Sequence, residues 1–196
     1  DPELSRGLGD VYKRQLPALA ADVSALHFGS YASVVEPVGS AMLTLAERYA
    51  DRFISYDPNS RPTVEPDMEV WRRRIDQFRR LASMIKVSTE DLSLLFPERK
   101  PEEVAKSWAA AAPAKLLVLT DGANGLTGLF KGEELRAEAP PISVQDTVGA
   151  GDTIQASLMV SFARAEAFET RLSTVSIPEM QYYLERAAQA AAITCT

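Results

Sequence analysis

Cysteine and histidine are almost missing from this chain of 196 residues, which has one of each, Cys195 and His27. A single cysteine excludes an internal disulfide and a cysteine-rich zinc site. A single histidine argues against a histidine-based metal site and against a Ser-His-Asp triad. Because His27 stands in an apolar stretch, we expect it to have a structural role, either in the core or beside a functional site.

Long apolar runs and an excess of positive charge are also missing. No run approaches the ~20 residues of a membrane span, and no basic-then-apolar leader is visible. The formal net charge of -6 argues against a nucleic-acid surface, although a local cradle could still bind a small anion. The length and the hydrophobic content of 46% are ordinary for one globular domain. We therefore expect a cytoplasmic protein with no nucleic-acid or membrane partner.

The two ends of the sequence differ from the rest. Residues 1–15 show no clear amphipathic period, and residues 10–15 resemble the in-frame translation of a transposon-end adapter used in sequencing libraries. We predict that residues 1–15 are adapter-like or disordered and non-native, the alternative being a genuine flexible arm. The last Ala-rich helical pattern stops without a capping glycine. The expectation is a fragment cut at both ends, with residues 16–196 forming a partial domain.

Apolar periodicity predicts strands that alternate with helices along most of the chain. Strands are predicted at residues 25–30, 52–56, 84–87 and 115–120, and an antiparallel pair is predicted at residues 125–131 and 133–139. Helices are predicted at residues 37–50, 67–82, 102–112, 149–165 and 178–193, with a brief one capped by Ser88 or Thr89. This alternation indicates an α/β sandwich with a mostly parallel central sheet, whose strand-to-helix loops meet along one edge.

The most informative run is residues 146–152, Asp-Thr-Val-Gly-Ala-Gly-Asp, which we expect to join a strand to a helix. Three small residues, Gly149, Ala150 and Gly151, let the backbone turn sharply and expose consecutive N–H groups. At the start of a helix, these donors and the helix dipole favour an anion. The carboxylate of Asp152 stands beside them. A phosphate cradle next to a potential general base is what phosphoryl transfer to a hydroxyl requires.

Two other loops are expected at the same edge of the sheet. In residues 120–125, the glycines permit close approach of a flat ring or a phosphate, and Thr120 and Asn124 offer hydrogen bonds; a plain turn into a hairpin explains this loop equally well. In residues 57–61, Arg61 could clamp a substrate or phosphate oxygen, or it could be a solvated residue of a Pro-rich turn.

Two common nucleotide-binding signatures are absent from the sequence. There is no Gly-x-x-x-x-Gly-Lys-Ser/Thr loop and no Gly-x-Gly-x-x-Gly that opens a first βαβ unit. The spacing of Gly122, Gly125 and Gly128 does not fit the dinucleotide pattern, and these glycines precede an expected hairpin and not a helix. A nicotinamide-dependent oxidoreductase is therefore disfavoured.

Residues 146–152 resemble the Asp-Thr-x-Gly-Ala-Gly-Asp signature of the ribokinase-like (PfkB) carbohydrate kinases. The strand at residues 116–119, followed by Thr120 and Gly122, is similar to the nucleotide loop of that family. Residues 56–62 resemble a segment common in its fructokinase and 2-keto-3-deoxygluconate kinase branches. The order and spacing of the motifs agree. The resemblance implies a three-layer α/β/α ribokinase-like sandwich that lacks the family's N-terminal strands and lid.

The resemblance also implies roles for individual residues. Asp152 would be the general base, and Gly149, Ala150 and Gly151 would form an anion hole for the γ-phosphate of ATP. Asn59 and Arg61 would lie on the sugar side. The nucleotide side would be formed by Ser88, Thr120, Gly122, Asn124, Gly125 and Thr147.

The same resemblance implies ions. Asp146 and the backbone of Val148 would contribute to a monovalent-cation site, occupied by K⁺. Mg²⁺ would arrive with ATP, held mainly by phosphates and water. Residues 88–91 stand where the family often has Asn-x-x-Glu, so Asp91 is carried over as a weak Mg²⁺ ligand. Asp121 stands where a leucine is more usual.

The expected activity is ATP-dependent phosphorylation of a sugar hydroxyl, most like that of fructokinase, by a parent enzyme that forms a homodimer. One alternative changes the substrate within the family to 2-keto-3-deoxygluconate or a nucleoside, and Arg61 favours a carboxylated or phosphorylated ligand. Another alternative is an inactive remnant that only binds nucleotide. Because the lid and most sugar contacts of the family are missing, we expect this chain alone to be inactive.

Overall fold

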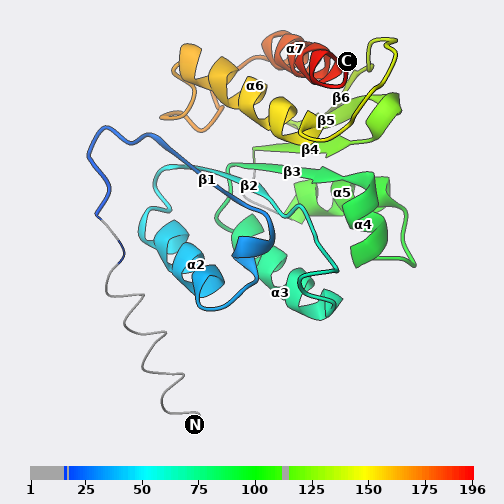
Figure 1. Cartoon of the computed structure of the whole chain (residues 1–196). Helices are drawn as coiled ribbons and strands as arrows, with labels where there is room; N and C mark the ends of the chain where they lie inside the picture. The colour runs from blue at the N-terminus through cyan, green and yellow to red at the C-terminus, as the bar shows by residue number, and fades with distance from the viewer. Residues whose placement is uncertain (1–15, 17, 112–114) are drawn as a thin grey trace, which may run out of the picture.

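The described part of the chain forms a six-stranded sheet with its strands in chain order (Figure 1). The computed structural model describes residue 16, residues 18–111 and residues 115–196. The first four strands pair parallel, and the fifth and sixth each pair antiparallel with the strand before it. This confirms the predicted mostly parallel sheet. The strands are β1 (Ala25–Gly29), β2 (Phe53–Asp57), β3 (Met84–Ser88), β4 (Leu116–Thr120), β5 (Leu126–Phe130) and β6 (Glu133–Ala137). The segment expected to be non-native, residues 1–15, lies outside the described residues.

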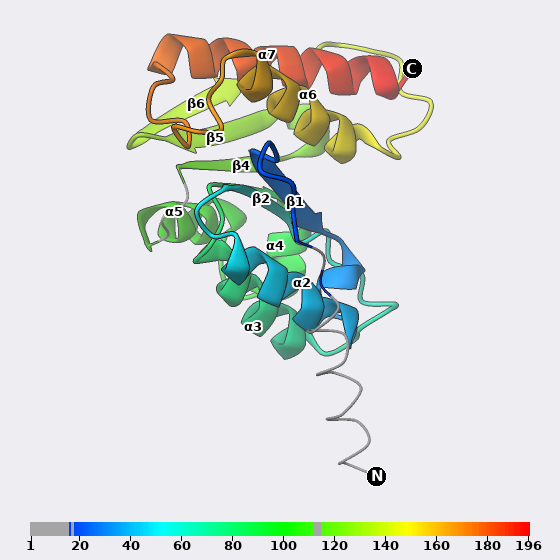
Figure 2. The ribbon, with the colours of Figure 1, turned by 90° about the vertical axis from the view of Figure 1, so that its left-hand side faces the viewer.

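Helices cover both faces of this sheet, which confirms the expected three layers (Figures 1 and 2). One face carries α2 (Val38–Arg48), α3 (Met68–Arg79), α4 (Thr89–Leu95) and α5 (Pro101–Ala111). The other face carries α6 (Ala150–Arg164) and α7 (Ile177–Thr194). Two short 3₁₀ turns, η1 (Tyr31–Ser33) and η2 (Gly122–Asn124), follow β1 and β4. No helix in the described ranges has the length and apolarity that a membrane crossing requires.

An apolar core lies on each face of the sheet, because successive side chains of a strand point to opposite faces. On one face, Tyr56 of β2 stacks on Phe78 of α3 with 4.5 Å between the ring centroids. On the other face, Phe53 of β2 packs against Phe162 of α6 and Phe168, with 6.0 and 4.9 Å between centroids. These two cores hold the helices against the sheet.

Polar residues interrupt the second core at the carboxyl ends of β2 and β3. Strand alternation points Ser55 and Asp57 of β2, and Lys86 of β3, toward α6. All three are buried. Gln155 of α6 meets this layer, donating from Nε2 to the Ser55 hydroxyl at 2.5 Å. A buried polar layer therefore lies under the first turns of α6.

Side-chain caps set the beginnings of several helices. Ser88 begins α4: its hydroxyl accepts a hydrogen bond from the backbone N–H of Asp91 at 3.0 Å, so of the two predicted caps Ser88 is the one used. Ser176 begins α7 in a capping box with Glu179. Gly149 begins α6 in a left-handed conformation, with φ of 83°. That backbone conformation suits glycine, and it produces the sharp turn expected from the sequence.

One prediction is wrong: no strand leads into residues 146–152. Between β6 and α6 the described chain has no regular secondary structure. Pro140 and Pro141 lack the backbone N–H that a sheet ladder needs. The segment is held instead by the end of α7, where the carbonyl of Cys195 accepts a hydrogen bond from the N–H of Gln145 at 2.9 Å.

Candidate active site

Chain segments that are far apart in sequence meet at the carboxyl ends of the parallel strands. The segment after β2, the end of β3 and the loop after β4 all lie at this edge, and the N-terminus of α6 reaches it from the other layer (Figure 1). A Cβ built on Gly151 of α6 would lie 3.1 Å from Lys86 Nζ of β3. Residues 146–152 and 57–61 therefore come together as expected. Lys86 packs against Gly151 and forms an ion pair with Asp57.

The N-terminus of α6 presents backbone donors that the described chain does not use. Thr153 is the first residue of this run to bond within the helix, donating from N to the Gly149 carbonyl at 2.8 Å. The N–H groups of Gly149, Gly151 and Asp152 have no recorded acceptor among the described residues, whereas that of Ala150 has a long bond to Thr147. Free N–H groups at a helix N-terminus form an anion site together with the helix dipole.

Residues 146–148 approach this site in a tight local turn. A carboxylate oxygen of Asp146, Oδ1, accepts a hydrogen bond from the N–H of Val148 at 2.9 Å. Both residues are exposed, as is Thr147. This turn leaves the other Asp146 oxygen and the Val148 carbonyl without a recorded partner in the described chain. These two oxygens are the ligands that the resemblance assigned to a monovalent cation.

Asp152 lies in the first turn of α6 with an exposed side chain. No hydrogen bond or salt bridge to its carboxylate is recorded among the described residues, so its oxygens are open to a ligand. Its neighbour Thr153 is fixed by the end of α7, with 2.9 Å between the hydroxyls of Thr153 and Thr194. The helix therefore holds a free carboxylate next to the unpaired N–H groups.

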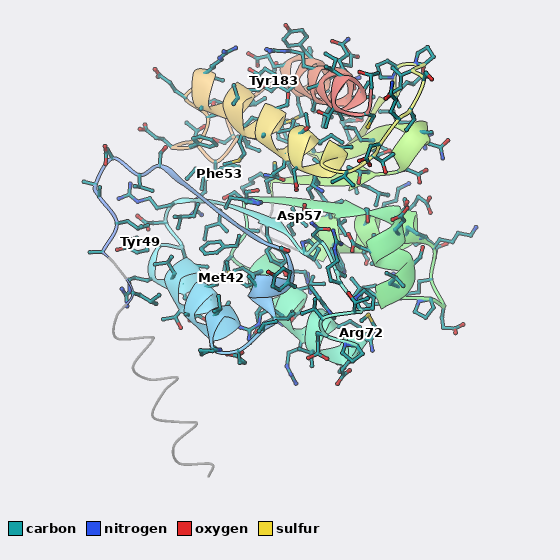
Figure 3. The ribbon with its side chains drawn as sticks, in the orientation of Figure 1. Met42, Tyr49, Phe53, Asp57, Arg72 and Tyr183 are labelled. Atoms are coloured by element: carbon teal, nitrogen blue, oxygen red, sulfur yellow. The ribbon has the colours of Figure 1, made fainter. Side chains whose placement is uncertain are left out.

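A buried ion pair lies beneath this turn. Lys86 Nζ is 2.7 Å from Asp57 Oδ2, and each side chain is 6% exposed. The other oxygen of Asp57, Oδ1, has no hydrogen-bond partner in the described part of the chain. Burial raises the pKa of Asp57, and the Lys86 ammonium opposes this shift. Figure 3 shows Asp57 at the end of β2, beneath α6.

His27 of β1 extends the polar layer toward the edge of the sheet. Its Nδ1 lies 3.3 Å from the Ser55 hydroxyl, which also accepts from Gln155. The residue is exposed, so of the two expected positions the structure shows the one beside the site. The ring nevertheless loses part of its hydration, and this partial desolvation lowers the pKa of His27, while the carboxylate of Asp57 opposes the shift.

The loop after β2 is fastened to the start of α4 through Asp91. Asp91 Oδ1 accepts from the N–H of Ser60 at 2.7 Å, and Oδ2 accepts from the Ser88 hydroxyl at 2.8 Å. Asn59 takes a left-handed φ of 43°, and Arg61 donates to the Ser60 carbonyl at 2.9 Å while remaining exposed. In this structure Asp91 and Ser88 fix the loop that carries Asn59 and Arg61. Their metal and nucleotide roles remain predictions.

The loop after β4 is fixed by Asp121, the residue that departs from the family pattern. Its Oδ1 accepts from the Thr89 hydroxyl at 2.8 Å, and its Oδ2 accepts from Asn124 Nδ2 at 2.9 Å. Asn124 is thus already used within the loop. Thr120 ends β4 in register with Ser88, half-buried at the edge of the sheet. A hollow of about 260 Å³ lies beside this loop, lined by residues that include Thr89, Asp121 and Asn124.

Gly125 closes this loop with a φ of 87°, and its position leaves no room for a side chain. A Cβ there would overlap the carbonyl oxygen of Ala137 and lie 2.8 Å from the nitrogen of Ala139. We expect Gly125→Ala to lower the free energy of unfolding by about 2–5 kcal/mol, combining backbone strain with overpacking. Urea unfolding followed by circular dichroism measures this loss.

Gly132 provides the matched control for that substitution. It has a similar φ of 84°, but nothing lies within 4 Å of the place that a Cβ would take there. Gly132→Ala should therefore cost only the backbone strain, about 1–2 kcal/mol. Equal losses for the two variants would show that the contact with the β6 segment does not constrain the loop.

Neither Asp57 nor Lys86 was predicted from the sequence to be a residue of the site. The available signal was a lysine within the apolar run of residues 84–87, because a lysine is seldom buried without a partner.

A larger hollow, about 690 Å³, lies elsewhere, at the opposite end of β4 beside Lys115 and Gly132. Within the described residues, no group of three or more His, Cys, Asp or Glu side chains is arranged to hold a metal ion.

Sequence comparison finds sugar kinases. A profile of the pfkB family carbohydrate kinases matches residues 7–196, beginning within the segment that we expected to be non-native. A fructokinase of Rhizobium leguminosarum bv. trifolii is 34% identical over 165 residues, which are 84% of this chain and 50% of that protein. Probable fructokinase-7 of Arabidopsis thaliana is 33% identical over 144 residues, 70% of this chain and 41% of that protein. The chain spans about half the length of the curated relatives it matches.

Structure comparison finds the same fold. A fructokinase of Vibrio cholerae O395, solved with fructose, ADP and calcium, has a TM-score of 0.80 and 22% identity over 94% of this chain and 58% of that one. An aminoimidazole riboside kinase of Salmonella enterica, solved with aminoimidazole riboside and an ATP analogue, has a TM-score of 0.75 and 22% identity over 88% and 56%. The expected ribokinase-like sandwich is thereby confirmed.

Proposed function

Because the chain belongs to the PfkB family of carbohydrate kinases, we propose that it carries the phosphoryl-transfer site of a fructokinase-like enzyme. The reaction moves the γ-phosphoryl group of ATP to a sugar hydroxyl. One observation supports this most: at the start of α6, N–H groups that have no acceptor among the described residues lie beside the Asp152 carboxylate, which has no partner there either. An anion site with an adjacent base suits phosphoryl transfer to an alcohol.

In this mechanism Asp152 accepts the proton of the attacking hydroxyl. The sugar oxygen forms a bond to the γ-phosphorus, and the bond to the bridging oxygen of ADP breaks. Gly149, Ala150 and Gly151 donate backbone hydrogen bonds to the phosphoryl oxygens as charge moves through the transition state. The helix dipole of α6 adds a fixed positive potential there. The long bond from Ala150 to Thr147 would be exchanged for the ligand.

A Mg²⁺ ion here would be bound chiefly by the ATP phosphates, because the described residues offer it no cluster of carboxylates. Both oxygens of Asp91 already accept hydrogen bonds, so this carboxylate is better suited to an indirect contact through water than to direct coordination. Mg²⁺ bound to ATP supplies charge neutralisation on the phosphates. The Val148 carbonyl and the free oxygen of Asp146 would hold K⁺ beside the anion site.

The two fastened loops would then hold the substrates. Residues 120–125, with Ser88 and Thr147, would contact the nucleotide, and Asn59 and Arg61 would contact the sugar. The exposed guanidinium of Arg61 suits a carboxylate or phosphate as well as a hydroxyl. This keeps 2-keto-3-deoxygluconate as the second candidate substrate.

The substrate is tested by incubating the full-length gene product with ATP and Mg²⁺, and separately with fructose, 2-keto-3-deoxygluconate or a ribonucleoside. ADP release is followed with a coupled assay. We expect fructose to give the highest kcat/KM. Highest activity with the keto acid or the nucleoside would move the protein to another branch of the family, and no ADP release with any of the three would contradict the kinase assignment.

A further inference from the structure

Lys86 is a buried cation with unused donors. It lies in β3 between apolar residues and is 5% exposed. An ammonium group carries three N–H donors. Asp57 Oδ2, at 2.7 Å, is the one acceptor recorded for it among the described residues. A buried donor without an acceptor costs free energy, so this arrangement calls for a further negatively charged or strongly accepting group.

The ammonium is placed against the first turn of α6. Its distance of 3.1 Å to a Cβ built on Gly151 means that the nitrogen packs directly on that residue, where glycine leaves room for it. Gly151 is also one of the residues whose N–H has no recorded acceptor in the described chain. The lysine charge and the backbone donors therefore lie at the same turn, although Lys86 comes from the sheet and Gly151 from the helix layer above it.

Asp57 fixes this placement. Its Oδ2 holds the ammonium from below, and strand pairing holds β2 and β3 side by side. The carboxylate also compensates the burial of the lysine charge, because each group is the counter-ion of the other. Its second oxygen, Oδ1, is buried and has no partner among the described residues. An anionic ligand offers that oxygen no donor, so the donors that remain for such a ligand are those of Lys86.

We propose that Lys86 contacts the phosphoryl group bound at the N-terminus of α6, and that Asp57 is the positioning residue for its ammonium. The inference rests on the proposed function and adds a side-chain cation to an anion site otherwise made of backbone. Charge-assisted contacts of this kind change affinity by about ten- to hundred-fold. The effect should be strongest for the terminal phosphate.

The test uses Lys86→Met, the double variant Asp57→Asn/Lys86→Met, and Lys115→Met in the full-length gene product. Lys115 is an exposed lysine at the far end of β4, so its variant removes the same charge away from the site. Binding of the non-hydrolysable β,γ-imido analogue of ATP and of ADP is measured by titration calorimetry, and the melting temperature is measured alongside.

We expect Lys86→Met to melt at a lower temperature, because it leaves the Asp57 carboxylate buried alone. The double variant should recover most of that loss. Both variants should bind the ATP analogue about ten- to hundred-fold more weakly and ADP less than about three-fold more weakly. Lys115→Met should bind both ligands as the wild type does.

A double variant that regains stability and also binds the ATP analogue as tightly as the wild type would overturn the inference, because Lys86 would then be structural only. Equal losses for the ATP analogue and ADP would also overturn it, since the contact would not be to the terminal phosphate. Wild-type protein that binds neither nucleotide would instead contradict the proposed kinase function itself. The failures of the two proposals are therefore distinguishable.

Discussion

Asp152→Asn is expected to lower kcat by about 10²–10⁴-fold while changing KM little. Asparagine keeps the size and position of the side chain at the start of α6, but it cannot accept the proton of the attacking hydroxyl. The described structure leaves the Asp152 carboxylate exposed and without a recorded partner, so the substitution breaks no observed contact. Steady-state kinetics of the full-length gene product with ATP and the preferred sugar measure both constants.

Asp22→Asn is the matched control, since Asp22 is an exposed carboxylate that precedes the amino end of β1, opposite the edge where the site lies. Its kinetics should equal those of the wild type. Circular dichroism should show that both variants are folded. Turnover by Asp152→Asn within about three-fold of the wild type would exclude Asp152 as the general base, because a base contributes at least about 10²-fold.

Phe162→Ala is expected to lower the free energy of unfolding by about 3–5 kcal/mol. Phe162 is fully buried on α6, and its ring lies 6.0 Å from those of both Phe53 on β2 and Tyr183 on α7. Figure 3 labels these two partners, which lie on either side of α6. The truncation leaves a cavity between the sheet and the helix that carries the anion site. Urea unfolding at equilibrium measures the loss.

Val160→Ala on the same helix is the control for the loss of apolar volume. Val160 is 48% exposed, so its truncation should change stability by less than about 0.5 kcal/mol. The kcat of correctly folded Phe162→Ala should stay near the wild-type value, because this residue is in the last turns of α6 and Asp152 is in the first. A stability loss below about 1 kcal/mol for Phe162→Ala would mean that α6 is not anchored by this aromatic contact.

Much of the fold could be predicted from local patterns. The apolar run at residues 116–119 predicted a buried strand, and all four residues are buried in β4. The turn at Gly132 predicted the hairpin of β5 and β6, and the structure pairs these strands antiparallel. Ser88 was one of two candidates for a helix cap. These features depend on residues within a few positions of one another, which is why the sequence alone carries them.

The exceptions depend on contacts between distant segments. The approach to residues 146–152 is not a strand, since it is held by the carbonyl of Cys195, from the far end of α7, through a bond to Gln145. The pair of Asp57 and Lys86 joins two strands, and no local pattern in the sequence predicts how these strands align. A lysine in an apolar run was visible in the sequence, but its partner and its place against Gly151 required the fold.

The candidate site also combines features that the sequence predicted with features that only the structure shows. The run from Gly149 to Asp152 was identified from its composition, and the structure gives it the expected helix start, with N–H groups that the described residues leave unused. The loops were predicted as ligand contacts, yet the structure also gives Asp91 and Asp121 the task of fastening them. The same types of polar side chain hold loops and bind ligands, so the sequence alone does not distinguish these two roles.

The central claim is that this site transfers a phosphoryl group from ATP to a sugar. It is tested most directly by ³¹P NMR of the full-length gene product with ATP, Mg²⁺ and fructose. We predict a sugar-phosphate resonance that grows in equal amount with ADP, and its loss in Asp152→Asn. Growth of inorganic phosphate alone, or a sugar phosphate that forms equally fast without the Asp152 carboxylate, would contradict it.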